Sequence, residues 1–269
     1  MEEILQIGLY RLIAAYIFVL ILILIAKYKN VGHQKQIVLA SFRMTIQLVL
    51  VGYLLTYIFD SPNPLFTIGI LAVMEVFAVF NIYGRVQADL SMELKKKIAF
   101  AMAAGTLISI FYFILIIINL RPWFHPQYFI PISGMLIGNS MTGISLGVEG
   151  LINGIKDNRM MIENALMLGA SPEHASREVS NRAFYNAILP TLNSMMGMGI
   201  VFLPGMMTGH ILAGAAPLLA IKYQIAIMMG ILGSVTLTVY LLVKLGTRSF
   251  FNERAQIVIE NDGNNNQKE

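Results

Sequence analysis

The chain of 269 residues contains no cysteine. This absence excludes disulfides, thiol catalysis and metal sites built on thiolates. Charged residues are also scarce, at 13% of the chain, whereas 57% of the residues are hydrophobic. A soluble globular domain carries roughly 25% charged residues. The low charge and the mean hydropathy of +0.68 therefore predict an integral membrane protein.

Several motifs of other protein classes are missing as well. The chain has no G-x-x-x-x-G-K-[ST] segment, so it lacks a P-loop for ATP, and it has no H-E-x-x-H pair of a metalloprotease. The alternating pattern of an outer-membrane barrel is absent, which leaves helices as the spanning element. The basic residues behind the net charge of +4 gather at the ends of the predicted membrane spans, so they do not indicate a nucleic-acid-binding surface. We expect no catalytic residues, no cofactor bound by this chain and no nucleic-acid partner.

Seven apolar segments approach or reach the ~20 residues that a helix needs to cross a bilayer. We place them near residues 9 to 26, 38 to 59, 65 to 82, 98 to 119, 128 to 149, 191 to 212 and 222 to 244. Lysines and arginines gather after the first, third, fifth and seventh segments, for example Lys27, Arg85, Arg159 and Lys244. The positive-inside rule then places the N-terminus outside and the C-terminus in the cytoplasm.

The sequence thus predicts an all-α, polytopic helical bundle in a cell membrane, either a bacterial inner membrane or a plasma membrane. Residues 1–249 form the membrane domain in this prediction. Residues 250–269 form a cytoplasmic tail whose end, NDGNNNQKE, has nothing apolar to bury and should be largely disordered.

One long polar stretch, residues 158–187, lies between hydrophobic blocks on the predicted cytoplasmic side. Gly169 can end one helix in the left-handed conformation, Ser171 can cap the next, and Pro172 fits its first turn. We therefore expect a helix-turn-helix. Met161, Ala165 and Leu168 fall at helical spacing and form an apolar ridge. This ridge either folds back on the protein's own surface or fits a groove on a separate protein.

The same stretch resembles the coupling loop of ABC transporter permeases, which docks on an ATPase. The resemblance rests on Glu163, Ala165, Gly169 and Ala170, followed by Pro172. It is partial. Asn164 stands where the loop has its first alanine, and the Ile-Leu-Pro end of the motif, at residues 188–190, comes later than in importers.

A wider run of the chain consists of ALMLGASPEHA, then ILPTLNSMMGMGIVFLPGMMTGHILAG and IKYQIAIM. This run is similar to the FetB-type iron-export permease family, whose plant relatives are linked to aluminium tolerance. The resemblance covers most of the chain. It implies the permease subunit of an ABC exporter of a metal ion such as iron, not an enzyme itself. It also implies a separate ATPase that uses the ATP, and a homodimer of permease subunits.

Glu75 lies in the middle of a predicted span, where a charge is expensive, so we expect it to face a cavity or a partner. Arg43 and Gln47 are one helical turn apart on the second span and could supply that partner. Two interpretations stay open, a structural ion pair and a role in the translocation path.

Pro204 and Gly205 offer a kink point in the sixth span and are candidates for the translocation path. They lie close in sequence to His210 and to a methionine cluster that includes Met206 and Met207. Thioether and imidazole groups ligate soft or borderline metals, although methionine is also a flexible packing residue. We name Glu75, His210, Met206 and Met207 as candidate metal ligands.

Small residues four apart, at Gly134 and Gly138, Gly143 and Gly147, and Gly205 and Gly209, predict close helix packing within the subunit or between two copies. The Gly143-x-Ser145-x-Gly147 match also allows an intramembrane serine protease, but a spanning helix does not provide the turn that a nucleophile elbow needs. A second alternative is an ATP-independent channel or ion-coupled carrier that uses Glu75.

Overall fold

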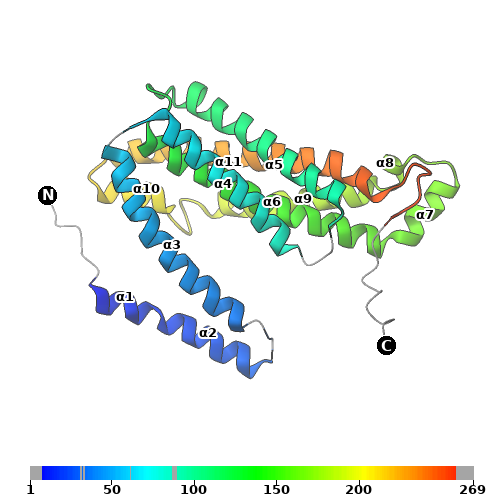
Figure 1. Cartoon of the computed structure of the whole chain (residues 1–269), viewed down its shortest axis with the longest axis horizontal. Coiled ribbons are helices and arrows are strands. Elements are labelled where there is room, and N and C mark those ends of the chain that lie inside the picture. The colour runs from blue at the N-terminus through cyan, green and yellow to red at the C-terminus, as the bar shows by residue number, and fades with distance from the viewer. Residues whose placement is uncertain (1–7, 31, 33, 61, 87–89, 259–269) are drawn as a thin grey trace. The chain divides into compact units, whose positions relative to one another are not determined.

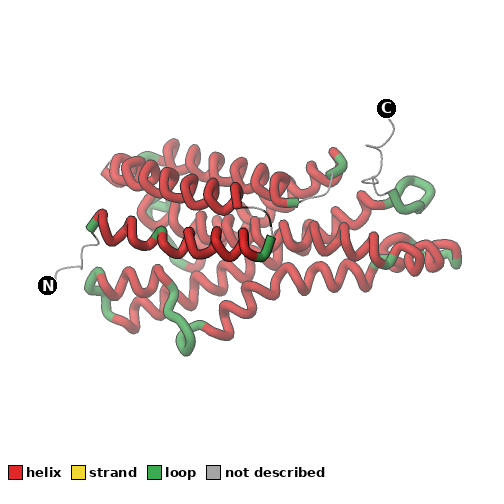
Figure 2. The backbone as a smooth tube through the Cα atoms, turned by 90° about the horizontal axis from the view of Figure 1, so that it is seen from below, coloured by secondary structure: helices red, strands yellow, loops and turns green. Residues whose placement is uncertain are grey.

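The computed structural model describes residues 8–30, 32, 34–60, 62–86 and 90–258. Within these ranges the regular secondary structure is entirely helical (Figure 2), which confirms the predicted all-α fold. The helices are α1 (Leu9–Ala15), α2 (Ile17–Tyr28), α3 (Gln34–Asp60), α4 (Pro64–Arg85), α5 (Met92–Tyr112) with the π-helix η1 (Phe113–Ile117), α6 (Pro126–Asp157), α7 (Arg159–Met167), α8 (Pro172–Ala175), α9 (Arg177–Gly197), α10 (Gly205–Leu212), α11 (Pro217–Gly246) and the 3-10 helix η2 (Thr247–Phe250).

The chain divides into two compact units, Met1–Pro62 and Asn63–Glu269. In the first unit, a hydrogen bond between the hydroxyls of Tyr16 and Thr45 links the start of α2 to α3. Ala26 and Ile58 are the buried residues of its described helices, and the other apolar side chains are half-buried or exposed. Such an open apolar surface suits helices that contact lipid.

In the second unit, α6 is the central helix, and α4, α5, α9 and α11 pack around it (Figure 1). Its 32 residues span about 48 Å at 1.5 Å per residue. This length exceeds the ~30 Å hydrocarbon layer, so one or both ends of α6 project beyond it. The helices α7 and α8 lie at one end of this unit and α10 lies at the other (Figure 1).

Small residues let these helices approach closely. A Cβ atom added at Gly143 would lie 2.9 Å from Val235 Cγ1, and one added at Gly147 would lie 3.1 Å from Leu242 Cδ2. Both contacts join α6 to α11, which confirms the predicted packing role of this pair within one subunit. By contrast, Gly138, Gly205 and Gly209 have nothing within 4 Å of such an atom.

Among the residues that the structure describes, six helices are long and apolar enough to cross a membrane, and they correspond to six of the seven predicted spans. The segment predicted near 191 to 212 differs. The helix α9 ends at Gly197 and α10 begins at Gly205, so the expected kink at Pro204 and Gly205 is a full interruption. The physical reason is local, because Gly199 has a left-handed φ of +85° and Pro204 is in an extended conformation.

The described part of the predicted tail folds back on the bundle. Phe250 is buried, Val258 N donates to its carbonyl at 2.8 Å, and an antiparallel bridge joins Phe251 to Ile257. The rest of the predicted tail, residues 259–269, lies outside the described residues.

Candidate functional site

The turn between α7 and α8 has the capping geometry that its sequence predicts. Gly169 has φ of +89°, and its N–H donates to Leu166 O at 3.0 Å, while Ala170 N donates to Ala165 O at 3.0 Å. These two bonds close α7 as a Schellman motif. Ser171 Oγ then accepts from His174 N at 3.3 Å and caps α8, whose first residue is Pro172.

The helix α7 has two apolar faces with different environments. Ile162 is fully buried and Leu166 packs on the same core, which fixes the helix to the bundle. The opposite face is open: Met160, Met161, Met167 and Leu168 are exposed, with Leu168 at 90%. We call these four residues the α7 face.

The predicted ridge is therefore split between two environments. Ala165 is half-buried, whereas Met161 and Leu168 belong to the α7 face. Glu163 is paired along the helix with Arg159, whose Nε lies 2.7 Å from its Oε1. Ala165 thus packs partly on the protein's own surface, while docking of Met161 and Leu168 on a separate protein stays a prediction. An open apolar patch outside the bundle is the kind that binds another protein.

The helix α9, which follows this turn, packs closely on the rest of the bundle. A Cβ atom added at Gly154 would lie 2.5 Å from Val179 Cγ1, and one at Gly150 would lie 3.2 Å from Ala183 Cβ. Ser180 Oγ and Thr247 Oγ1 are 3.0 Å apart, which ties α9 to η2 as well. The start of α9 is thus in close contact with α6 on one side and the end of α11 on the other.

The interruption between α9 and α10 satisfies much of its own backbone. Gly199 N donates to Phe202 O, and Val201 N donates to Gly197 O, both at 2.9 Å. Many of its side chains are open, with Ile200 91% exposed, although Met195, Met198 and Met206 contact the core. A segment that pairs its own polar groups can exist at membrane depth where it lines a cavity or contacts protein.

The candidate metal ligands have separate neighbours. The His210 ring on α10 faces the Tyr223 ring on α11 at 6.0 Å between centroids. Met206 and Met207 are half-buried on α10. Among the described residues, no three His, Asp or Glu side chains come together as a metal site. Metal binding by Glu75, His210, Met206 and Met207 stays a prediction.

Glu75 is buried, at 8% exposure, and its structural neighbour is one that sequence reasoning missed. Thr106 Oγ1 on α5 makes a hydrogen bond with Glu75 Oε1, while Oε2 has no hydrogen-bond partner. The pairing with Arg43 and Gln47 stays a prediction, because those residues belong to the other compact unit. The helical spacing of Thr106 and Ser109 on an apolar span was the available signal.

Gln224 is a second buried polar group that the sequence interpretation did not single out. Its Nε2 lies 3.9 Å from Met198 Sδ, and its Oε1 has no hydrogen-bond partner. Gln224 therefore connects α11 to the interrupted segment through one weak contact. Its signal in the sequence was a polar amide between apolar residues of the last span.

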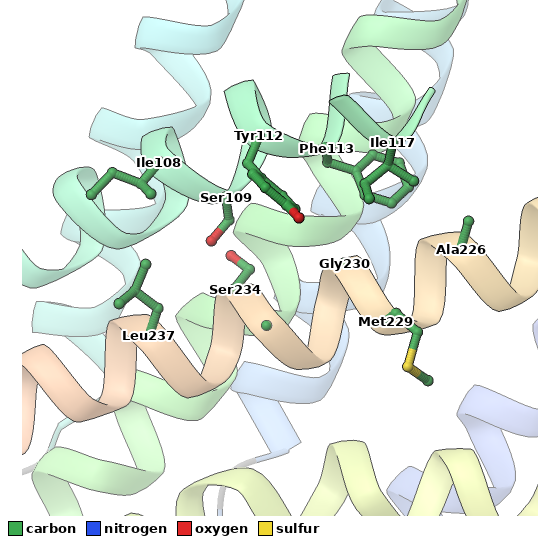
Figure 3. A pocket seen from close by; sticks show the side chains of 11 residues that line it. Ile108, Ser109, Tyr112, Phe113, Ile117, Ala226, Met229, Gly230, Ser234 and Leu237 are labelled. Atoms are coloured by element: carbon green, nitrogen blue, oxygen red, sulfur yellow. The ribbon is translucent and has the colours of Figure 1, made fainter. Parts of the chain in front are cut away.

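A groove of about 610 Å³ lies between α5 with η1 and α11 (Figure 3). Its lining is apolar apart from Ser109, Tyr112 and Ser234, and the two serine side chains point toward one another. Gly233 leaves the surface of α11 open in the groove, whereas Gly230 lets the Phe113 ring of η1 approach closely, since an added Cβ atom would lie 2.7 Å from Phe113 Cδ2. The spacing of Ala226, Gly230 and Ser234, four residues apart, would have indicated it.

The serine-protease alternative has no support in the geometry. Ser145 lies inside the continuous helix α6 and its hydroxyl donates to Met141 O at 2.9 Å. The His210 ring packs edge-on against the Tyr223 ring. A nucleophile elbow requires a strand-to-helix turn, and the described residues around Ser145 form no such turn.

Comparison with known proteins gives a consistent result. The family described as Uncharacterised protein family (UPF0014) matches residues 9–251. The probable iron export permease protein FetB of Escherichia coli is 32% identical, over 91% of this chain and 93% of its own length. Protein ALUMINUM SENSITIVE 3 of Arabidopsis thaliana is 33% identical, over 93% of this chain and 90% of its own length.

A third relative, the UPF0014 membrane protein slr1647 of a Synechocystis strain, is 35% identical over 88% of this chain and 91% of its own length. No solved structure matches the chain.

Proposed function

The chain belongs to the UPF0014 family of multi-pass membrane proteins, and on that premise we propose that it is the permease subunit of an ATP-driven exporter. In this proposal it works with a separate ABC-type ATPase. The E. coli relative is named a probable iron export permease, which favours a metal ion such as iron as the cargo.

The α7 face is the observation that supports transport driven by a partner ATPase. Four large apolar side chains stand exposed on a short helix that Ile162 anchors to the end of the bundle. This end follows the long helix α6 and lies beyond the stretch predicted to cross the membrane, where no lipid covers such residues. An apolar helix face of this kind fits a groove on a partner protein.

The packing suggests how ATPase closure is transmitted. A force on α7 passes through the Gly169 turn and α8 into α9, which is locked to α6 at Gly150 and Gly154. The far end of α9 leads into the interruption at residues 198–204 and then α10. We propose that this loosely held part switches access to a path that includes Glu75, with His210 near its outer end. Two permease chains would pair with two ATPase subunits.

The first experiment tests the docking face. Leu168→Glu places a charge in the proposed contact and removes about 1.5 to 3 kcal/mol of apolar burial. We expect at least a tenfold loss of affinity for a candidate ABC-type ATPase of the same genome, since 1.4 kcal/mol corresponds to tenfold. The measurement is co-purification from membranes, quantified by band ratio.

Asn181→Glu is the matched control, because it adds the same carboxylate at an exposed position on α9 that is not one of the four residues of the α7 face. Equal association of wild type, Leu168→Glu and Asn181→Glu with the ATPase would refute the docking role. Gly169→Pro gives an independent arm, because proline cannot adopt the φ of +89° found there. Intact association and export in this variant would show that the turn has no coupling role.

The cargo is tested in cells. Export of iron predicts that cells lacking the protein accumulate iron and that cells overproducing it contain less. Iron content that is unchanged in both would remove the metal assignment.

A further inference from the structure

The helix α9 is long enough to cross a membrane but too polar to face lipid on all sides. It packs along α6 (Figure 1), which is one of the membrane spans. Its 21 residues could cross the hydrocarbon layer, which needs about 20, yet α9 is not one of the six sufficiently apolar helices of the described chain. The open side of α9 therefore needs a surrounding other than lipid.

The close pairs of α6 and α9 fix which of their residues lie at the same level. Gly154 is close to Val179, and Gly150 is close to Ala183, with 2.5 and 3.2 Å to an added Cβ atom. Residue numbers fall along α6 as they rise along α9, so the two helices are antiparallel. A step of four residues on one helix, about 6 Å, is matched by the same step on the other.

This register brings two asparagines to the middle of the membrane. Eleven residues back along α6 from the last pair is Asn139, and ten further along α9 is Asn193, so the two are nearly level. Next to Asn139, Ser140 Oγ is 2.9 Å from Ser234 Oγ, and Ser234 lies near the middle of the span Pro217–Phe250. Both asparagines are exposed at a depth where lipid offers no hydrogen-bond partner.

Other half-buried or exposed polar residues recur along both helices. On α6 they are Asn139, Thr142 and Glu149, and on α9 they are Arg182, Asn186 and Asn193. We call these six residues the polar face. Spacings of three, four and seven residues place those of each helix on one side. Pro190, which is exposed, has no N–H, so the carbonyl oxygen of Asn186 lacks its helical donor.

The polar face borders one side of the contact between α6 and α9. Asn139 is one turn from Gly143, where an added Cβ would lie 3.6 Å from Ala187 O of α9, and Asn186 is one turn from Ala183. The helix α11 covers the other side of this contact, because it packs on both helices. The exposed asparagines therefore lie together on the side that α11 leaves open.

Water is the surrounding that satisfies these groups. Asn139 Nδ2 donates to Met135 O at 2.7 Å, whereas the side-chain amides of Asn186 and Asn193 have no hydrogen-bond partner among the described residues. Polar side chains at membrane depth face a protein interior or a water-filled cavity. The polar face lies on the outside of one subunit, so such a cavity needs a second wall.

The charges of the polar face offset one another. Glu149 and Arg182 each precede a member of the contact pair Gly150 and Ala183, so they are level with each other. Beyond them, towards the middle of the membrane, the polar face carries neutral amides and a hydroxyl. A neutral lining that is rich in oxygen atoms suits a small cation that keeps part of its water shell.

We propose that the polar face lines a water-filled path through the membrane, which two copies of the chain enclose. A further step rests on the proposed function: the exported cation passes along this path as a hydrated ion. The path is distinct from the position of Glu75, whose carboxyl group makes a hydrogen bond with Thr106 of α5.

Cysteine labelling tests the path directly, because the natural chain contains no cysteine. Asn139→Cys and Asn193→Cys are treated in membrane fragments with a small, charged methanethiosulfonate reagent. Val73→Cys is the matched control, since Val73 is 69% exposed near the middle of the apolar span α4. Labelling after denaturation gives the total thiol, and elution as a single species in mild detergent establishes that each variant is folded.

We expect both asparagine positions to react about tenfold or more faster than Val73→Cys, because apolar surroundings suppress the reactive thiolate. A bifunctional thiol reagent should also link two copies of Asn193→Cys and not two copies of Val73→Cys. Equally slow labelling at all three positions would overturn the water-filled path. Slow labelling with a spontaneous disulfide between copies of Asn193→Cys would establish a dry contact instead. Fast labelling without any cross-link would refute enclosure by two copies.

The cargo step has a separate readout. Export of ferrous iron by Asn193→Cys should be lost on labelling, relative to the same variant before labelling, while the cysteine-free wild type should be unaffected by the reagent. Export that continues after complete labelling would refute passage along the polar face. Absence of iron export in the untreated wild type would refute the proposed cargo, whereas the labelling rates would still decide whether the path exists.

Discussion

The seam between α6, α9 and α11 and the stretch from residue 198 to 216 differ in how they are held. Along the seam, glycines bring backbones within contact of bulky side chains, as at Gly143 with Val235 and at Gly154 with Val179. In the stretch 198–216 the described residues include none that is buried, and Gly199, Gly205, Gly209 and Gly214 have open space around them.

This difference teaches where movement can occur. A close-packed seam has few arrangements of equal energy, because any displacement creates overlap or voids. The interrupted segment instead pairs much of its own backbone, as in the bond from Gly199 N to Phe202 O, and loses few contacts when it shifts. The seam is a rigid transmission element in this account, and residues 198–216 are the part that responds.

The largest predicted effect is a substitution in the tightly packed region. Gly105 faces the backbone of Thr238, with a would-be Cβ 2.9 Å from its Cα, so Gly105→Leu cannot be relieved by a side-chain shift. We expect destabilisation of about 3 kcal/mol, at the upper end of the range for overpacking. Thermal unfolding in detergent measures this.

Gly138→Leu is the matched control for Gly105→Leu, because an added Cβ there meets nothing within 4 Å. It should unfold close to the wild-type temperature. Similar losses in both variants would mean that glycine itself, rather than its close contacts, decides stability.

The second effect concerns the anchor of α7. Ile162 is fully buried, so Ile162→Ala should cost about 2 kcal/mol, at the lower end of the range for such truncations because α7 lies at the end of the bundle. The free energy of local opening, measured by hydrogen exchange of α7 amides, should fall by that amount. Met161→Ala, on the exposed α7 face, should leave exchange within about 0.5 kcal/mol. Equal protection in both variants would contradict the two-faced description of α7.

A smaller effect is expected at the polar pair across the seam. Ser140 Oγ and Ser234 Oγ are 2.9 Å apart and both residues are buried. A double-mutant cycle with Ser140→Ala and Ser234→Ala should give a coupling energy of about 0.6 kcal/mol, typical of hydrogen bonds between membrane helices. Coupling of zero would mean that the two hydroxyls do not interact.

The smallest effect on stability is expected in the interrupted region. Met206→Leu with Met207→Leu keeps the apolar volume at two positions that are not buried, and it should change the free energy of unfolding by less than about 0.5 kcal/mol. Export separates the two interpretations of these methionines. Loss of metal export with unchanged stability indicates ligation, whereas unchanged export indicates packing.

Sequence patterns predicted the helical framework well, because long apolar runs and glycine spacing are local signals. The Gly169 turn was predictable for the same reason, since Ser171 and Pro172 specify the next helix by themselves. The full interruption at residues 198–204 was not, because Pro204 and Gly205 allow either a kink or a break. Contacts such as those of Met198 with α11 decide whether a kink or a break is formed.

The candidate site was less predictable because it depends on which helices are neighbours. The sequence indicated only that Glu75 faces a cavity or a partner, and the packing of α4 on α5 is what brings Thr106 to it. The sequence predicted the apolar ridge on α7, but not which side of α7 faces the bundle. The rotation of α7 is fixed by Ile162, which lies off the ridge.

The central claim, that transport by this chain is driven by a partner ATPase, is tested most directly by metal flux in vesicles. The purified chain is reconstituted with and without the ABC-type ATPase, and accumulation of ferrous iron is followed with and without ATP. The account predicts flux only with both ATPase and ATP, and its loss in Leu168→Glu but not in Asn181→Glu. Flux of normal size without ATPase or ATP would contradict it and favour a channel or ion-coupled carrier.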